Sequence, residues 1–285
     1  MGDGSRLIAL ATQHGKERVL ARPFRWGLGL TLLRADQLDT DRFGSFSGEH
    51  ARPADALSTC RIKAEAAMRL TGLELGLASE GAFGPHPAMP MLAVGQEWMV
   101  YIDGPRQLLI HEHGISPRTN YAARALRRGD DLGPWLRAVG FPSHGLMVRP
   151  HLPEGSAQAG WLAKGIHEHG GLLQLLDQAA ALSPEGLAWL ETDMRAHCNP
   201  TRMASIRRLA FRLVRRVRST CPACGTPGWG KVKAVAGLPC GACGLATPLE
   251  LEEEWGCIRC DHRQLHPRRD QRRSADPMHC GWCNP

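Results

Sequence analysis

Four Cys-x-x-Cys pairs lie near the end of this 285-residue chain, and they constrain its fold more than any other feature. A Cys-x-x-Cys turn brings two thiolates to one ion, and two such turns complete the tetrahedral site that structural zinc prefers. Eight thiolates therefore predict two zinc ions in closed sites, which stabilise the fold and leave no position for catalysis. We expect residues 219–285 to form a double zinc-ribbon module. Its predicted metal ligands are Cys221, Cys224, Cys240, Cys243, Cys257, Cys260, Cys280 and Cys283.

The chemistry and the pairing of these cysteines leave alternatives open. Iron in a rubredoxin-like site has the same ligands, and disulfides would be the alternative in an exported protein. Fifteen residues separate the first pair from the second, and nineteen separate the third from the fourth. Both spacings suit a ribbon hairpin, so we favour the sequential pairing, first with second and third with fourth. A crossed pairing remains possible.

The net charge of +7 is unevenly distributed along the chain. Residues 1–193 hold 19 Lys and Arg against 21 Asp and Glu, whereas residues 194–285 hold 16 against 7. This basic stretch indicates an anionic partner, either nucleic acid or the phosphates of a nucleotide, and the simpler alternative is a solvated helix face. Three tryptophans of the module either stack on bases or fill its small core: Trp229, Trp255 and Trp282.

The sequence gives no indication of membrane insertion or export. No run approaches 18 apolar residues, and the first residues show no charged segment, apolar segment and cleavage site of a signal peptide. An apolar content of 43% is sufficient for a packed core. We therefore expect a soluble, cytoplasmic protein with no membrane partner.

Residues 1–218 carry alternating strand and helix patterns. The segment 6–12 predicts a strand, 54–71 a helix that stops at Gly72, and 73–80 a second strand. A hairpin follows over 98–113, and the segment 145–150 predicts a further strand. This order predicts an α/β domain with a mixed sheet, followed by the small metal module.

Three charged residues of this domain suggest a ligand site. Lys16 lies in the turn between the first strand and the next helix, Lys63 lies on the second helix, and Glu80 ends the second strand. The carboxyl ends of strands are where open α/β sheets bind ligands, and a Mg²⁺ ion held there would bridge phosphates and polarise water. The alternatives are solvated lysines and a glutamate that caps the next turn. His111 and His113 share one face of the hairpin. They could bind a metal, but a solvent-exposed face is the simpler interpretation.

The segment 191–218 combines a predicted helix start with several charges. Asn199 is a good N-cap before Pro200, and the exposed amides of such a helix start favour an anion. The side chains expected to bind that anion are Arg195, His197 and Arg202. Upstream, Glu191 and Asp193 would share one face of an extended segment, where they could hold a divalent cation or form salt bridges with nearby arginines.

Two resemblances bear on function. The motifs ATQHGKE, FSGEHARPADALSTCRIKAEAAMRLTG and LELGLASEGAFGP resemble the inosine-triphosphate pyrophosphatase superfamily, which includes the Maf proteins, over residues 6–90. The resemblance implies that Thr12, Lys16 and Lys63 bind phosphate. It further implies that Glu80, assisted by Glu49, holds Mg²⁺ and activates water. Separately, ETDMRAHCNPTRM, the four Cys-x-x-Cys pairs and the terminal CNP resemble an uncharacterised bacterial family of unknown function over nearly the whole chain.

These observations predict a Mg²⁺-dependent hydrolase of nucleoside triphosphates or related phosphate esters that carries a structural zinc module. Its partner would be a nucleotide or another phosphate-bearing small molecule. The alternative is a non-catalytic zinc-ribbon protein that binds nucleic acid through the basic helix and the metal module. In that case the α/β domain would be a scaffold or a ligand sensor.

Overall fold

The computed structural model describes residues 6–44, 54–86, 89–153, 160 and 162–285. The chain divides into two compact units, Met1–Leu213 and Val214–Pro285. Helix α5 (Pro200–Arg218) begins in the first unit and ends in the second, and the predicted domain boundary is its last residue. No helix in the described part of the chain is long and apolar enough to cross a membrane.

The first unit contains a mixed sheet whose strand order in the described residues is β2-β1-β3-β4-β5. β2, β1 and β3 run parallel, and β3, β4 and β5 form an antiparallel meander. The predicted α/β class with a mixed sheet is confirmed. The strands are β1 (Arg6–Ala11), β2 (Leu30–Arg34), β3 (Leu75–His86), β4 (Met89–Asp103) and β5 (Leu108–Ser116).

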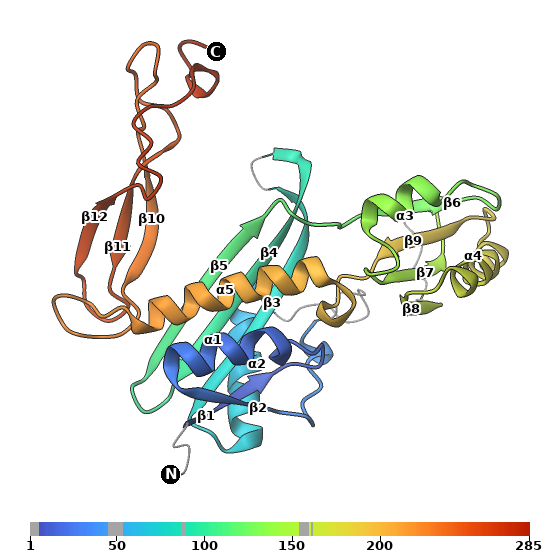
Figure 1. The fold of residues 1–285 in the computed structure, drawn as a ribbon, viewed down its shortest axis with the longest axis horizontal. Coiled ribbons are helices and arrows are strands. Elements are labelled where there is room, and N and C mark those ends of the chain that lie inside the picture. Colours follow the sequence, from blue (N-terminus) through green and yellow to red (C-terminus); the bar gives the residue numbers. More distant parts are fainter. Residues whose placement is uncertain (1–5, 45–53, 87–88, 154–159, 161) are drawn as a thin grey trace. The chain divides into compact units, whose positions relative to one another are not determined.

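Helices cover both faces of this sheet (Figure 1). α1 (Glu17–Leu28) and the first half of α5 lie on one face, and α2 (Ala56–Thr71) lies on the other. A short 3-10 helix, η1 (Asp41–Phe43), precedes α2. Small buried side chains, mostly alanines, let α2 approach the sheet closely. At Gly76 a Cβ atom would lie 2.6 Å from the sulfur of Met68 and 3.2 Å from the carbonyl oxygen of Ala64, so a larger residue would force the Met68 side chain to shift.

Strand β3 is longer than the sequence indicated. We predicted that the strand ends at Glu80 and that a glycine- and proline-containing loop follows, but β3 continues to His86, paired with β4 almost throughout. The parallel pairing of β1 with β3 nevertheless stops at Ala78. Glu80 therefore lies past the carboxyl end of β1 while it remains inside its own strand.

A smaller antiparallel sheet with the order β6-β9-β7-β8 completes the first unit. Its apolar face packs against two helices around a core that includes Leu136, Leu146, Leu172 and Leu190. The elements are β6 (Ala123–Leu126), α3 (Gly133–Val139), β7 (Leu146–Pro150), β8 (Ala163–Ile166), α4 (His169–Leu182), β9 (Ala188–Thr192) and the 3-10 helix η2 (Ala196–Cys198).

The segment between this sheet and the metal module follows the sequence prediction closely. α5 begins at Pro200, and the side-chain oxygen of Asn199 accepts a hydrogen bond from the Arg202 amide at 2.9 Å. The predicted N-cap therefore satisfies one of the free amides of the first turn. The buried face of α5 includes Ile206, Ala210 and Leu213.

The second unit is built on a three-stranded antiparallel sheet, β10-β11-β12. Its small core is formed by cysteines together with the buried indole of Trp229 and the partly buried Trp255. Trp229 is thus unavailable for base stacking, whereas Trp282 is 77% exposed. The elements are β10 (Gly230–Ala236), β11 (Glu250–Gly256), β12 (Arg263–Pro267) and the 3-10 helix η3 (Pro277–His279).

Candidate functional site

The eight cysteines of the second unit form two separate clusters. One contains Cys221, Cys224, Cys257 and Cys260, and the other contains Cys240, Cys243, Cys280 and Cys283. In each cluster the four sulfurs lie within 4.8 Å of one another. No other group of three or more convergent histidine, cysteine or acidic side chains occurs among the described residues.

The geometry of both clusters fits a tetrahedral zinc ion. Sulfur pairs in the two clusters are separated by 3.6 to 3.9 Å. Zn–S bonds of about 2.3 Å in a tetrahedron place the sulfurs about 3.8 Å apart. Backbone amides of the turns point at the sulfurs, as at Cys257, which accepts from the amides of Arg259 and Cys260 at 3.3 and 3.4 Å. Two zinc ions bound by these eight thiolates would stabilise the unit.

The favoured sequential pairing of the cysteine turns is wrong, and the crossed pairing is the one that forms. The cause is the register of the sheet, in which Gly230 at the start of β10 faces Gly256 at the end of β11. The turns before β10 and after β11 therefore meet at one end of the sheet. Glu252, near the start of β11, faces Pro267 at the end of β12, which brings the other two turns to the opposite end.

A second candidate site lies in the first unit, where the direction of the crossover connections changes. β1 is flanked by β2 and β3, and the helices that connect them lie on opposite faces of the sheet. The crevice at the carboxyl end of β1, beside the middle of β3, is therefore a topological switch point, the usual ligand position in open α/β sheets. The cavity there is lined by Ala11, Thr12, Gln13, His14, Lys16, Thr40, Asp41, Gly44, Lys63, Ser79 and Glu80.

Lys16 and Lys63 enter this crevice from opposite sides of the sheet. Lys16 caps α1, and its ammonium donates to the carbonyl oxygen of Ser79 at 2.7 Å. Lys63, on α2, donates to Glu80 Oε2 at 2.6 Å. The side chains of Lys63 and Glu80 are only 7% and 3% exposed. The sequence-predicted convergence of these three residues is therefore present in the structure.

The burial of Lys16 lowers its pKa from an ordinary value of 10.5 to about 8. Desolvation is the largest cause, and the positive charges of Arg202 and Lys63 act in the same direction. Glu97 and Glu80 oppose the shift. Lys16 is thus a buried cation whose charge is poorly compensated, which favours the binding of an additional anion.

A second buried ion pair stands next to the crevice. Arg202, the third residue of α5, donates from Nε to Glu97 Oε1 at 2.5 Å, and its Nη1 donates to the carbonyl oxygen of Met194 at the same distance. Glu97 lies on β4 directly opposite Gly81 of β3. A Cβ at Gly81 would lie 2.6 Å from both partners of this pair, so any larger residue would have to displace them.

The remaining predicted phosphate ligands occupy different positions. Thr12 lines the crevice, whereas Arg195 is held by Asp193 at 2.6 Å, the salt bridge that was the alternative to a cation site. His197 is exposed, and its ring lies 5.1 Å from that of His14 at the crevice. Glu49 lies outside the described residues.

Several residues near the crevice were not predicted. His14 belongs to the turn after β1, and its imidazole lies 3.7 Å from Asp41. Burial lowers the pKa of His14, and Asp41 partly opposes this shift. His14 could have been recognised from its position in a strand-to-helix turn. Glu97 could have been recognised as a glutamate inside an apolar strand. The hairpin histidines have structural partners: His113 stacks on Trp98 at 4.3 Å and contacts Gln96.

The space in the crevice is about 10 Å³, which admits about one water molecule in this conformation. A phosphate group would therefore have to displace side chains that line it, such as Lys16 from the Ser79 carbonyl. The charged groups of the site are therefore already in place, but the space for a phosphate group is not.

Comparison with known proteins identifies the family of the chain. Residues 63–285 match a family described as a domain of unknown function (DUF6671), and the chain belongs to that family. No curated protein and no solved structure matches the chain. The matched region contains Lys63, Glu80 and all eight cysteines of the two clusters, whereas Lys16 lies before it.

Proposed function

We propose that this protein binds the phosphates of a nucleotide or a related phosphate ester at the Lys16–Lys63–Glu80 crevice and hydrolyses that ligand. The observation that carries the proposal is the convergence of two buried lysines and a buried glutamate at the switch point of a mixed α/β sheet. Burying three ionisable groups together is costly, so their presence in one crevice supports a functional role. Perturbed ionisable groups in a crevice are typical of functional sites.

Each residue would have a distinct role. Lys16 stands at the N-terminus of the twelve-residue helix α1, where exposed amides and the helix dipole favour an anion. Lys63 would hold a second phosphate oxygen and would then release Glu80 from its ion pair. Glu80 would orient a water molecule or bind a divalent cation. Phosphoryl chemistry depends mainly on such positioning and charge neutralisation.

The crevice offers two carboxylates as ligands for Mg²⁺. Glu80 and Asp41 line the same crevice, and Mg²⁺ commonly binds to one or two carboxylates, water and substrate phosphates. When bound, the ion would polarise phosphate oxygens. Zinc ions in the two cysteine clusters would support the fold of the second unit, since four thiolates at each leave no open position for this chemistry.

The test is a panel of nucleoside triphosphates and diphosphates, assayed for phosphate and pyrophosphate release by the full chain with Mg²⁺ and with excess EDTA. We expect Mg²⁺-dependent release from at least one member. Lys63→Ala should raise KM, because it removes a phosphate contact, whereas the exposed control Lys233→Ala should not. Neither binding nor hydrolysis of any member would refute the proposal.

A second candidate function is nucleic-acid binding by the metal unit. Trp282 is exposed beside a cysteine turn, and Arg272 and Arg273 are exposed as well. Acidic side chains on β11 that would repel a backbone are paired internally, since Lys231 bonds Glu250 at 2.7 Å and contacts Glu253 at 3.4 Å. This arrangement suits a base-stacking indole within a basic surface.

The second candidate is tested by the salt dependence of oligonucleotide binding. Affinity for single-stranded DNA should fall steeply between about 50 and 200 mM salt. Changing both Arg272 and Arg273 to Gln should reduce that slope. Trp282→Ala should weaken binding and leave the salt slope unchanged. A wild-type protein that binds no oligonucleotide at about 50 mM salt would eliminate this candidate.

A further inference from the structure

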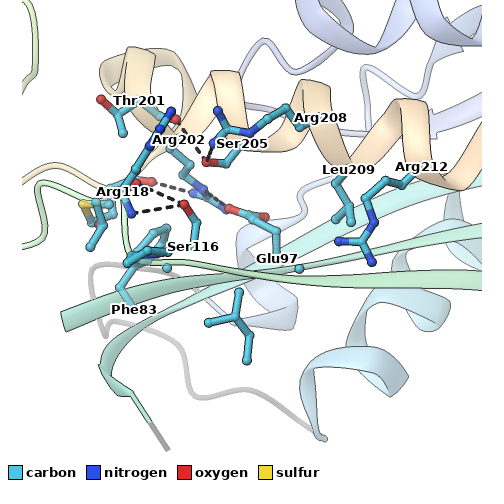
Figure 2. A pocket seen from close by; sticks show the side chains of 16 residues that line it. Phe83, Glu97, Ser116, Arg118, Thr201, Arg202, Ser205, Arg208, Leu209 and Arg212 are labelled. Carbon is cyan, nitrogen blue, oxygen red and sulfur yellow. Dashed lines mark hydrogen bonds and ion pairs between the residues drawn. The ribbon is translucent and has the colours of Figure 1, made fainter. Parts of the chain in front are cut away.

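A pocket of about 360 Å³ lies in the first unit between the sheet and the first half of α5 (Figure 2). Strands β3, β4 and β5 form its floor, and α5 forms one wall. The end of β5 and the segment after it, residues 116–119, close one end. Small-molecule sites are usually concavities of about 300–1,000 Å³, so the volume is sufficient for a compact organic ligand.

The floor is hollow because glycines alternate with larger residues. Phe83, Gly95 and Ser116 are cross-strand neighbours in one row of the sheet face. Gly81, Glu97 and Gly114 form the next row, so that half of these six positions carry no side chain. At Gly95 a Cβ would lie 2.9 Å from the Phe83 ring, and the ring therefore extends across the floor.

The pocket has one buried ion pair and a basic rim. Arg202 and Glu97 satisfy each other at the base, and Arg202 Cζ lies 5.2 Å from the centre of the Phe83 ring. At the rim, Arg118 and Arg208 are exposed. No carboxylate of the described residues forms an ion pair with either arginine. Arg212 differs, since it pairs with Glu112 at 2.7 Å.

Local hydrogen bonds hold the backbone of Arg118 and the guanidinium of Arg208. The backbone amide of Arg118 donates to the Ser116 hydroxyl at 3.2 Å, and Arg208 Nη2 donates to the Ser205 hydroxyl at 2.9 Å (Figure 2). The rest of the lining is largely apolar and includes Leu209 on α5. The pocket therefore has an aromatic and aliphatic interior beneath two cations without carboxylate partners.

We propose that this pocket binds an organic anion with a flat apolar body and a phosphate or carboxylate head. The body would lie against Phe83 and Leu209, and the head would contact Arg118 and Arg208. The buried Arg202–Glu97 pair separates this pocket from the Lys16–Lys63–Glu80 crevice, so the ligand binds at a site of its own. The inference does not rest on the proposed hydrolysis.

The test is calorimetric titration of the full zinc-loaded chain with 2-naphthyl phosphate, 2-naphthoate and inorganic phosphate. At least one of the two aromatic anions should bind, and inorganic phosphate should bind far more weakly because it lacks the body. Their relative affinities distinguish a phosphate from a carboxylate head. Arg118→Gln with Arg208→Gln should weaken binding at least about tenfold, since charged hydrogen bonds are lost. Arg207→Gln, an exposed change on the same helix outside the pocket, should leave it unchanged.

A filling variant tests the position of the body independently. A Cβ at Gly114 would make only ordinary contacts, 3.5 Å from Arg212 and from Leu209, so Gly114→Val should fold while its side chain occupies the pocket. Binding should then be lost. Absence of binding by both aromatic anions, or equal affinity of the double arginine variant and Arg207→Gln, would overturn the inference.

Discussion

Removing either partner of the Lys63–Glu80 pair should destabilise the first unit strongly, whereas removing both should not. The two side chains are almost fully buried and 2.6 Å apart. A buried charge that loses its partner costs about 3–5 kcal/mol, because its hydration is not restored. Replacing a buried pair with uncharged side chains of similar size is often close to neutral. Glu80→Gln and Lys63→Met should therefore each cost several kcal/mol, and the double variant should recover most of the loss.

The assay is hydrogen exchange of peptides from α2 and β3, measured by mass spectrometry on the full chain, since local opening free energies report on these elements separately from the metal unit. The matched control is the exposed Arg61–Glu65 pair on the same helix, at 2.7 Å. Its i,i+4 interaction should contribute only about 0.3–0.5 kcal/mol. If single changes at Lys63 and Glu80 lower the local stability no more than those at Arg61 and Glu65, the buried ion pair does not stabilise the unit as predicted.

Three further predictions concern the metal unit, Lys16 and Gly81. Full-length protein should contain about two zinc ions, and changing Cys221, Cys224, Cys257 and Cys260 together to Ser should leave about one, because the other cluster stays complete; elemental analysis showing none would favour the sequential pairing. Lys16 loses its proton near pH 8 in the folded protein but near 10.5 in the unfolded chain, so its contribution to stability rises with pH between these values. Affinity for pyrophosphate, measured by titration, should fall as pH rises through 8, and Lys16→Arg should remove that fall; an unchanged profile in Lys16→Arg would contradict the assignment. Gly81→Ala should destabilise the unit by about 1–3 kcal/mol in thermal or urea unfolding, since its Cβ meets the Arg202–Glu97 pair, whereas Gly84→Ala, on the same strand with open space around it, should have little effect.

Local patterns in the sequence predicted the elements that form through short-range interactions. The helix over 54–71, the hairpin over 98–113 and the Asn199 N-cap all occur in the structure. The convergence of Lys16 and Glu80 also followed from the chain order, because Lys16 follows β1 and Glu80 lies on the parallel neighbour β3, just past the point where β1 ends.

Long-range pairing accounts for what the sequence could not predict. The cysteine pairing depends on the register of three strands, and turn spacing alone is compatible with both arrangements. The extension of β3 past Glu80 depends on β4, which provides hydrogen-bond partners for a segment whose glycines and proline suggest a loop. The Arg202–Glu97 pair joins residues 105 positions apart, and no local pattern connects them.

We propose that Glu80 supports hydrolysis at the Lys16–Lys63–Glu80 crevice, and the ratio of two rates tests this role most directly. The measurement is kcat of Glu80→Gln relative to Glu65→Gln on the nucleotide that the wild-type protein hydrolyses best, with hydrogen exchange confirming that both variants are folded. Removing one preorganised charge from such a site typically lowers the rate on the order of a hundredfold or more. We predict a loss of that size for Glu80→Gln and none for Glu65→Gln. Equal rates in the two variants would contradict the account and would leave Glu80 as a structural partner of Lys63.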